Sequence, residues 1–283
     1  ADLGTSCEVK KFRAEKPDQY LTMGIAEQNM CSWAAGLARE GYRPFLHTFS
    51  VFLSRRILDQ VEMSVAYPNL PVTFVGFVPG ITTPGGVTHQ SINDVGIMRT
   101  VPNMAIFDVG DATDIEGVLD LVYEWNGPAY IRMLRKEVPR LFPANEPMVF
   151  NRARTITEGD DVLILSSSIC TEEAMRATAA LEDKGVSVQH MHVSTLKPFT
   201  DPTIVEALKK CKYGVVTMEN HYNIGGLGSA VADLMAENGI GKKLIKIGLN
   251  GYAHGASKMY LMTKYGIDAM NLVKSVEELI GKD

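Results

Sequence analysis

The sequence predicts an α/β protein of two domains, each a mostly parallel sheet flanked by helices. Apolar, strand-like runs alternate with helical patterns along the 283 residues, which is typical of βαβ units and of sheets buried on both faces. A stretch that contains Pro139, Pro143 and Pro147, with scattered charges and little periodicity, interrupts this alternation. The chain is long enough for a core on each side of that stretch.

The expected elements follow from these patterns. A strand-like stretch ends at residues 21–23, and the clear strands lie near 71–78, 104–108, 129–133, 162–167, 186–192, 214–219 and 244–248. Helices are expected near 27–39, 52–66, 112–125, 172–184, 201–211, 227–238, 257–265 and 271–280. We therefore place one domain at 1–140, a linker at 141–158 and a second domain at 159–283.

Composition excludes some classes of function. The net charge of −5 offers no basic excess for nucleic acid, and the longest apolar runs fall short of a membrane span. The four cysteines are scattered without a CxxC pair, which favours reduced thiols and a cytoplasmic protein. The opening Ala-Asp-Leu-Gly is typical of the end of a strand, so we expect residues upstream of Ala1.

Glu27 is the first candidate for chemistry. It stands at the start of a helix whose residues 30–38 are apolar nearly all round, after Gly24, which allows a tight turn. A first-turn acid commonly does no more than stabilise the helix dipole. A carboxylate at the end of a buried helix needs a partner, however, and a ligand nitrogen is one way to supply it.

His89 is the second candidate. It lies in Gly85-Gly86-Val87-Thr88-His89-Gln90, on a Gly-rich loop that follows the apolar run 71–78. Glycines allow the backbone of such a loop to approach a ligand closely. Ligands of open α/β sheets bind at the carboxyl ends of the strands, so this loop and the start of the helix at Glu27 predict a site.

At these residues the chain resembles the transketolase family of thiamine diphosphate enzymes. The resemblance rests on GIAEQNM from Gly24, Thr48-Phe49-Ser50-Val51-Phe52, GGVTHQ from Gly85, and Gly127-Pro128-Ala129-Tyr130 with Arg135, in that order and spacing. It covers essentially the whole chain. It implies a pyrimidine-binding domain before the linker and a transketolase C-terminal domain after it.

The resemblance also implies roles for the site residues. Glu27 matches the glutamate that hydrogen-bonds N1′ of the coenzyme's aminopyrimidine, and His89 matches the histidine that assists proton transfers at the donor's oxygens. The residues that match the coenzyme's surroundings are Phe52, Phe49, Asp2 and Ile25, of which Phe52 is the better candidate for stacking. Arg135 and Ser6 match residues that hold the sugar phosphate. The ordinary alternatives are core packing for the phenylalanines, a solvated arginine and a turn-capping serine.

Two departures from the family pattern concern the acceptor pocket. Gly85 stands where an aspartate reads a substrate hydroxyl, and Phe77 stands where a second phosphate-binding histidine is expected. We infer a two-carbon ketol transfer that involves an unusual sugar phosphate, branched or deoxy.

A further absence predicts a partner. The family holds the divalent metal of the coenzyme, Mg²⁺ or Ca²⁺, with a GDG motif, and the chain has none; in the nearest string, Asp111 is typical of a helix cap. We therefore expect no metal ligands here. The chain is also half the length of an undivided transketolase. We therefore expect the other half to be a separate pyrophosphate-binding subunit that carries the metal. The two subunits are expected to form a heterotetramer with the coenzyme between them, and this subunit alone is expected to be inactive.

Other interpretations stay open at this stage. The alternatives are a β subunit of a 2-oxoacid dehydrogenase, a deoxyxylulose-phosphate synthase-like enzyme, and an α/β binding protein that has lost the chemistry. The glycines at 225–228 do not form GxGxxG, so a nucleotide loop is disfavoured. His190 and His192 share one strand face without a third ligand, which favours structural roles, and the sequence offers no role for His254.

Overall fold

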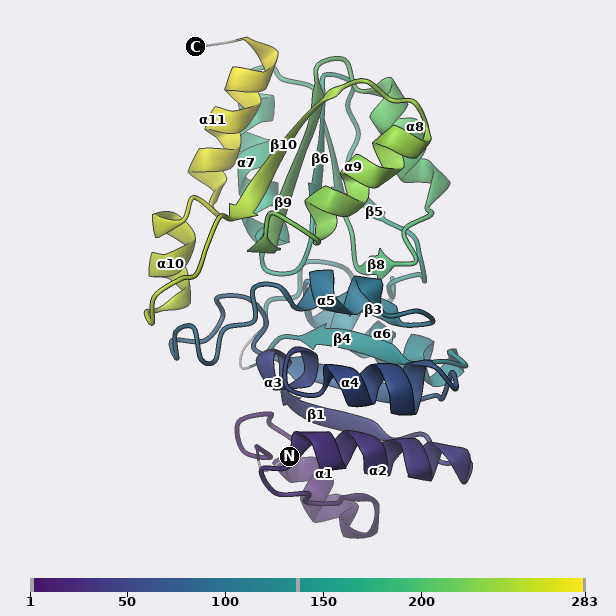
Figure 1. Cartoon of the computed structure of the whole chain (residues 1–283). Coiled ribbons are helices and arrows are strands. Elements are labelled where there is room, and N and C mark those ends of the chain that lie inside the picture. The colour runs from purple at the N-terminus through teal and green to yellow at the C-terminus, as the bar shows by residue number, and fades with distance from the viewer. Residues whose placement is uncertain (1–2, 136–137, 282–283) are drawn as a thin grey trace.

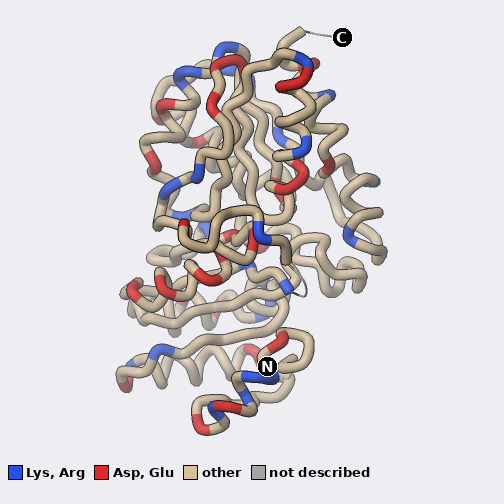
Figure 2. The backbone as a smooth tube through the Cα atoms, turned by 180° about the vertical axis from the view of Figure 1, so that it is seen from behind, with Lys and Arg blue, Asp and Glu red and all other residues tan. Residues whose placement is uncertain are grey.

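The computed structural model describes residues 3–135 and 138–281, and its strands form two five-stranded sheets. The sheets lie one above the other, with the first half of the chain below and most of the second half above (Figure 1). Within the described residues, no helix is long and apolar enough to cross a membrane. Lys and Arg are interspersed with Asp and Glu along the backbone (Figure 2).

The first sheet has the strand order β1-β2-β4-β3-β8. Its pairs are parallel except the last, β3 with β8, which is antiparallel. The strands are β1 (Phe45–Phe49), β2 (Thr73–Phe77), β3 (Ala105–Asp108), β4 (Ala129–Met133) and β8 (Thr195–Lys197).

The second sheet has the order β10-β9-β6-β7-β5 and is likewise parallel except at one edge, where β5 runs against β7. Its strands are β5 (Arg154–Thr157), β6 (Val162–Ser166), β7 (Val188–His192), β9 (Gly214–Tyr222) and β10 (Lys243–Leu249). The predicted fold class, two mostly parallel sheets flanked by helices, is confirmed.

Helices flank both sheets (Figure 1). In the first half of the chain they are α1 (Lys10–Glu15), η1 (Pro17–Gln19), α2 (Glu27–Arg39), α3 (Ser50–Ser54), α4 (Leu58–Gln60), the π-helix η2 (Val61–Ala66), α5 (Asp94–Thr100) and α6 (Ala112–Glu124). In the second half they are α7 (Cys170–Asp183), α8 (Pro202–Lys210), α9 (Leu227–Glu237), α10 (Lys258–Lys264) and α11 (Ala269–Ile280).

Several local predictions were wrong. Residues 20–26 form no strand, and the helix expected at 52–66 is broken into α3, α4 and η2 by a turn at Arg55 and Arg56. The short elements α1, β1, α5, β5 and β8 were not predicted. In addition, the strand predicted near 214–219 continues to Tyr222, so that Asn220 and His221 also belong to β9.

The two halves of the chain share part of their core. One apolar cluster includes Met98 and Ile106 of the first half together with Leu163, Leu196 and Val215 of the second. The strand β8 follows the expected linker in sequence yet completes the first sheet, and β5 lies inside the stretch expected as linker. The boundaries 1–140, 141–158 and 159–283 stay a prediction, because these features join the two sides.

Candidate active site

The candidate site lies where three parallel strands of the first sheet end. Phe49, the last residue of β1, pairs in register with Phe77 at the end of β2, which pairs with Met133 at the end of β4. The chain continues from these strands to Phe52, His89 and Arg135, respectively. Because carboxyl ends of parallel strands share one edge, residues far apart in the sequence converge there.

The rings of Phe49, Phe52 and His89 form a contact cluster. The two phenylalanine rings stack with centroids 5.9 Å apart, and the imidazole meets them edge-on at 6.1 and 5.8 Å. Thr88 Oγ1 lies 2.8 Å from His89 Nδ1, which orients the exposed imidazole. The predicted aromatic pair and the predicted histidine thus contact one another.

Glu27 begins α2, and its side chain is only 4% exposed. Arg56 Nη1 donates a hydrogen bond to Glu27 Oε2 at 3.0 Å, and the same guanidinium lies over the Phe52 ring, 4.1 Å from its centroid. Arg56 therefore joins the carboxylate to the aromatic cluster. Arg56 was not predicted from the sequence; the only signal was the adjacent pair Arg55-Arg56, three positions after Phe52.

A hollow of about 450 Å³ opens beside this carboxylate. It is lined by Ile25, Ala26, Glu27, Gln28, Asn29 and Arg56. Ile25 is 83% exposed, although it is a large apolar residue. The hollow thus combines a buried carboxylate, an exposed apolar side chain and, across Arg56, an aromatic ring, a surface suited to a planar heterocycle that carries ring nitrogens.

Arg135 and Ser6 also come together. Arg135 Nη1 donates to the backbone oxygen of Ser6 at 3.1 Å, and the guanidinium carbon lies 5.9 Å from the centroid of the Phe49 ring. Both side chains are partly exposed. The pair therefore contacts the aromatic cluster through Phe49, whereas Glu27 reaches it through Arg56 and Phe52. Asp2, the remaining predicted site residue, lies outside the described residues.

The two departures from the family pattern have a structural basis. Phe77 is 8% exposed and packs in an apolar cluster, so this position serves the core. A Cβ atom on Gly85 would lie 2.8 Å from His89 Cβ and 3.0 Å from its Cγ. The absence of a side chain at Gly85 thus provides the space that the His89 side chain occupies.

We expect Gly85→Ala to displace the His89 ring and to lower turnover on the order of 10-fold to 100-fold, the scale of a misplacement of about 1 Å. Gly251→Ala is the matched control, because a Cβ atom there meets nothing within 4 Å. Turnover of both variants and the imidazole resonance of His89 measure the effect. Unchanged turnover and an unmoved resonance in Gly85→Ala would contradict it.

The other polar residues singled out by sequence have structural partners. Asp111 caps α6 by accepting a hydrogen bond from the Asp114 amide, as expected. His192 contacts Asp114 and Thr171, and His190 contacts Ser166. In the described part of the chain, no group of three or more His, Cys, Asp or Glu side chains could hold a metal ion.

Comparison with known proteins assigns both halves of the chain. Residues 1–140 match the family "Transketolase, pyrimidine binding domain", and residues 151–271 match "Transketolase, C-terminal domain". The chain is 37% identical to a 6-deoxy-6-sulfo-D-fructose transketolase subunit of Clostridium sp. (strain MSTE9), over 99% of this chain and 87% of that relative. It is 31% identical to one subunit of the apulose-4-phosphate transketolase of Actinobacillus succinogenes, over 96% of this chain and 88% of that relative.

A solved structure described as a split gene transketolase, inactive beta4 tetramer, has a TM-score of 0.91 and 34% identity, covering 99% of this chain and 90% of that chain. The chain therefore belongs to the transketolase family, whose enzymes depend on thiamine diphosphate. It contains the pyrimidine-binding and C-terminal domains and is a β-type subunit of a split transketolase. The resemblance inferred from the sequence motifs is confirmed.

Proposed function

We propose that this subunit, joined to a pyrophosphate-binding partner subunit, transfers a two-carbon ketol unit between sugar phosphates. In that reaction the C2–C3 bond of a donor ketose breaks, and the two-carbon unit is joined to the aldehyde carbon of an acceptor. Thiamine diphosphate, when bound, supplies the carbon nucleophile. The observation that carries the proposal is the contact series from Glu27 through Arg56 and Phe52 to His89 at one sheet edge.

The residues present fit the coenzyme. The buried Glu27 carboxylate borders a hollow, where its hydrogen bond would hold N1′ of an aminopyrimidine. Phe52, supported by Phe49, offers a ring against which the pyrimidine would pack, and Ile25 adds apolar surface. Asp2 is proposed to lie near the coenzyme. We propose that the divalent metal is bound by the partner subunit, since this sequence lacks the GDG motif.

The substrate side of the site follows from the remaining residues. His89 is exposed and lies against both phenylalanines, where its imidazole can accept or return a proton at the donor's oxygens. Arg135, with Ser6 beside it, is proposed to bind the sugar phosphate, because guanidinium geometry matches phosphate oxygens. In this proposal His89, which transfers protons, lies between the residues that bind the coenzyme and those that bind the sugar phosphate.

The acceptor is proposed to be atypical, a branched or deoxy sugar phosphate. Gly85 stands where the family pattern has an aspartate that binds a substrate hydroxyl, and Phe77 stands where it has a phosphate-binding histidine. The names of two relatives, which refer to 6-deoxy-6-sulfo-D-fructose and apulose 4-phosphate, support this choice. The name of the similar inactive beta4 tetramer supports a subunit that self-associates and lacks activity alone. We propose that the active form is a heterotetramer with the partner subunit.

The test is to purify this chain with a candidate partner that carries GDG, and to assay ketol transfer with thiamine diphosphate and Mg²⁺. We expect activity only in the assembled pair, with the size of a heterotetramer, and slower turnover of xylulose 5-phosphate with ribose 5-phosphate than of a branched or deoxy sugar. Full-speed turnover of the common pair contradicts the substrate proposal. Acyl transfer to lipoamide, or condensation of pyruvate with glyceraldehyde 3-phosphate, would instead identify one of the alternative enzymes.

A further inference from the structure

The loop that carries His89, residues 78–91, is closed at its base by a hydrogen bond from Gly80 N to Ser91 O at 2.8 Å. We call it the His89 loop. His89 is exposed on it, whereas the next residue, Gln90, is 3% exposed. The second half of the chain contacts this loop at two separate points.

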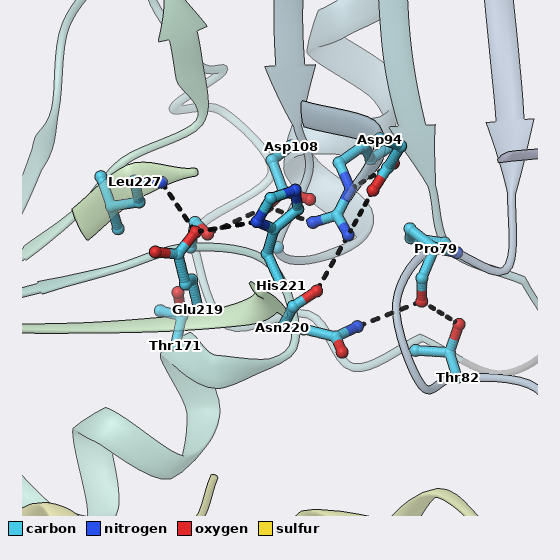
Figure 3. A network of polar contacts seen from close by, with 12 residues as sticks. Pro79, Thr82, Asp94, Asp108, Thr171, Glu219, Asn220, His221 and Leu227 are labelled. Carbon is cyan, nitrogen blue, oxygen red and sulfur yellow. Dashed lines mark hydrogen bonds and ion pairs between the residues drawn. The ribbon is translucent and has the colours of Figure 1, made fainter. Parts of the chain in front are cut away.

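Asn220 holds the base of the His89 loop. Its Oδ1 accepts a hydrogen bond from Ile81 N at 3.0 Å. Its Nδ2 donates to Pro79 O at 3.1 Å (Figure 3). Gly80, between these two residues, has φ +58°, and a Cβ atom on it would overlap the Asn220 side chain. The fully buried Asn220 amide therefore satisfies the backbone groups of Pro79 and Ile81, which would otherwise need hydrogen-bond partners from a neighbouring strand.

Asn220 is itself held rigidly. Its backbone oxygen accepts a hydrogen bond at 2.9 Å from Arg132, whose guanidinium also binds Asp94 and Asp108 (Figure 3). Two residues on, Tyr222 N donates to Ile92 O at 2.7 Å, just past the loop. The end of β9 is thus hydrogen-bonded to the first half of the chain both at Asn220 and beyond it.

A second contact holds the C-terminal part of the loop. Gln90 Nε2 donates to His254 O at 3.0 Å and to Thr83 O at 3.3 Å, so one amide ties two segments of the chain together. Next to it, a Cβ atom on Gly255 would lie 2.7 Å from Pro84 O. The backbone of residues 254–255 therefore packs directly against the His89 loop, which gives the segment around His254 a role that the sequence did not reveal.

We propose that the second half of the chain positions His89 for catalysis, with Asn220 and Gln90 as the positioning residues. This inference rests on the proposed function, in which His89 takes part in ketol transfer. Asn220 fixes the base of the loop, and Gln90 fixes its C-terminal part, next to His89 in the sequence. The C-terminal domain then contributes to the reaction as well as to packing, because a histidine on an unanchored loop would sample unproductive positions.

The test compares Gln90→Met with Arg99→Met in the assembled enzyme. Gln90→Met keeps the volume and removes both hydrogen bonds. Arg99→Met removes a contact of similar kind between the two halves, to Gly225 O and Asp233, that does not involve the loop. We expect Gln90→Met to lower kcat about 10-fold with little change in KM, and Arg99→Met to leave both unchanged.

Two further measurements separate positioning from general stability. In a His89→Ala background, Gln90→Met is expected to cause no additional loss, and in the full chain alone it should shift or broaden the His89 imidazole resonance. An equal loss in both backgrounds, or an unmoved resonance with unchanged kcat, overturns the proposal. If Gln90→Met does not fold, Gly255→Ala, which pushes on Pro84 O, must produce the same pattern. If His89→Ala retains full activity, the proposed role of His89 in ketol transfer fails, while the resonance still tests whether Gln90 anchors the loop. If the assembled wild-type pair shows no ketol transfer, the proposed function fails.

Discussion

Glu27→Gln in the assembled enzyme is expected to lower ketol transfer by about 10²- to 10³-fold, the scale of removing one preorganised hydrogen-bonding group from a catalytic site. Glutamine keeps the shape of the side chain but loses its acidic function toward the aminopyrimidine. The side chain is 4% exposed, so solvent cannot easily replace the lost interaction. The measurement is kcat with saturating coenzyme and sugar.

The same substitution is expected to change stability little. The ion pair between Glu27 and Arg56 is 3.0 Å long, but Arg56 is 44% exposed, and pairs that solvent screens contribute less than about 1 kcal/mol. Asp59→Asn, at an exposed acid of α4, serves as the matched control and should leave turnover unchanged. Ketol transfer at the original rate in Glu27→Gln, with the melting temperature preserved, would remove Glu27 from the mechanism.

The fold was predictable wherever a strand or helix had its own sequence pattern. The interior strands β2 and β6 are buried along their length and appear as mostly apolar runs. β4 and β9 begin with apolar residues but also bury polar ones, such as Arg132 and Glu219. The missed strands β1, β5 and β8 lie at sheet edges, where less apolar sequence is needed. β8, with three residues, exists only because its partner β3 comes from the other half of the chain, which local sequence cannot reveal.

Part of the site was predictable from local sequence and part from the family resemblance. Glu27 at a helix start and His89 on a Gly-rich loop were singled out by their own patterns, whereas Phe52 and Arg135 came from the resemblance. In the structure Phe52, His89 and Arg135 each follow a strand of the same sheet, so parallel topology brings them to one edge. Arg56 and Asn220 were not predictable in this way. Arg56 reaches Glu27 because the helix after β1 breaks at a turn, and Asn220 reaches the His89 loop from 139 and 141 positions away, at Ile81 and Pro79.

The largest stability effect is expected at Arg132. This guanidinium is fully buried, donating to Asp94 Oδ2 and to Asp108 Oδ2 at 2.9 Å each and to Asn220 O. Burial raises the pKa of Asp108 above its usual range, while Arg132 opposes that rise. Arg132→Met would therefore leave two buried carboxylates without their cation, a loss of about 3–5 kcal/mol in the free energy of unfolding.

Urea titration of the full chain measures this loss, with Arg140→Met as the control. Arg140 pairs with Glu116 at 2.8 Å on the surface, where solvent screens the pair, so its removal should change the free energy of unfolding far less than the loss of Arg132. The double variant Arg132→Met, Asp108→Asn is expected to lose less free energy of unfolding than the sum of the two single variants. The reason is that the neutral amide replaces one of the two buried carboxylates that Arg132→Met leaves without a cation. Equal unfolding midpoints for Arg132→Met and Arg140→Met would show that the buried network does not hold the two halves of the chain together.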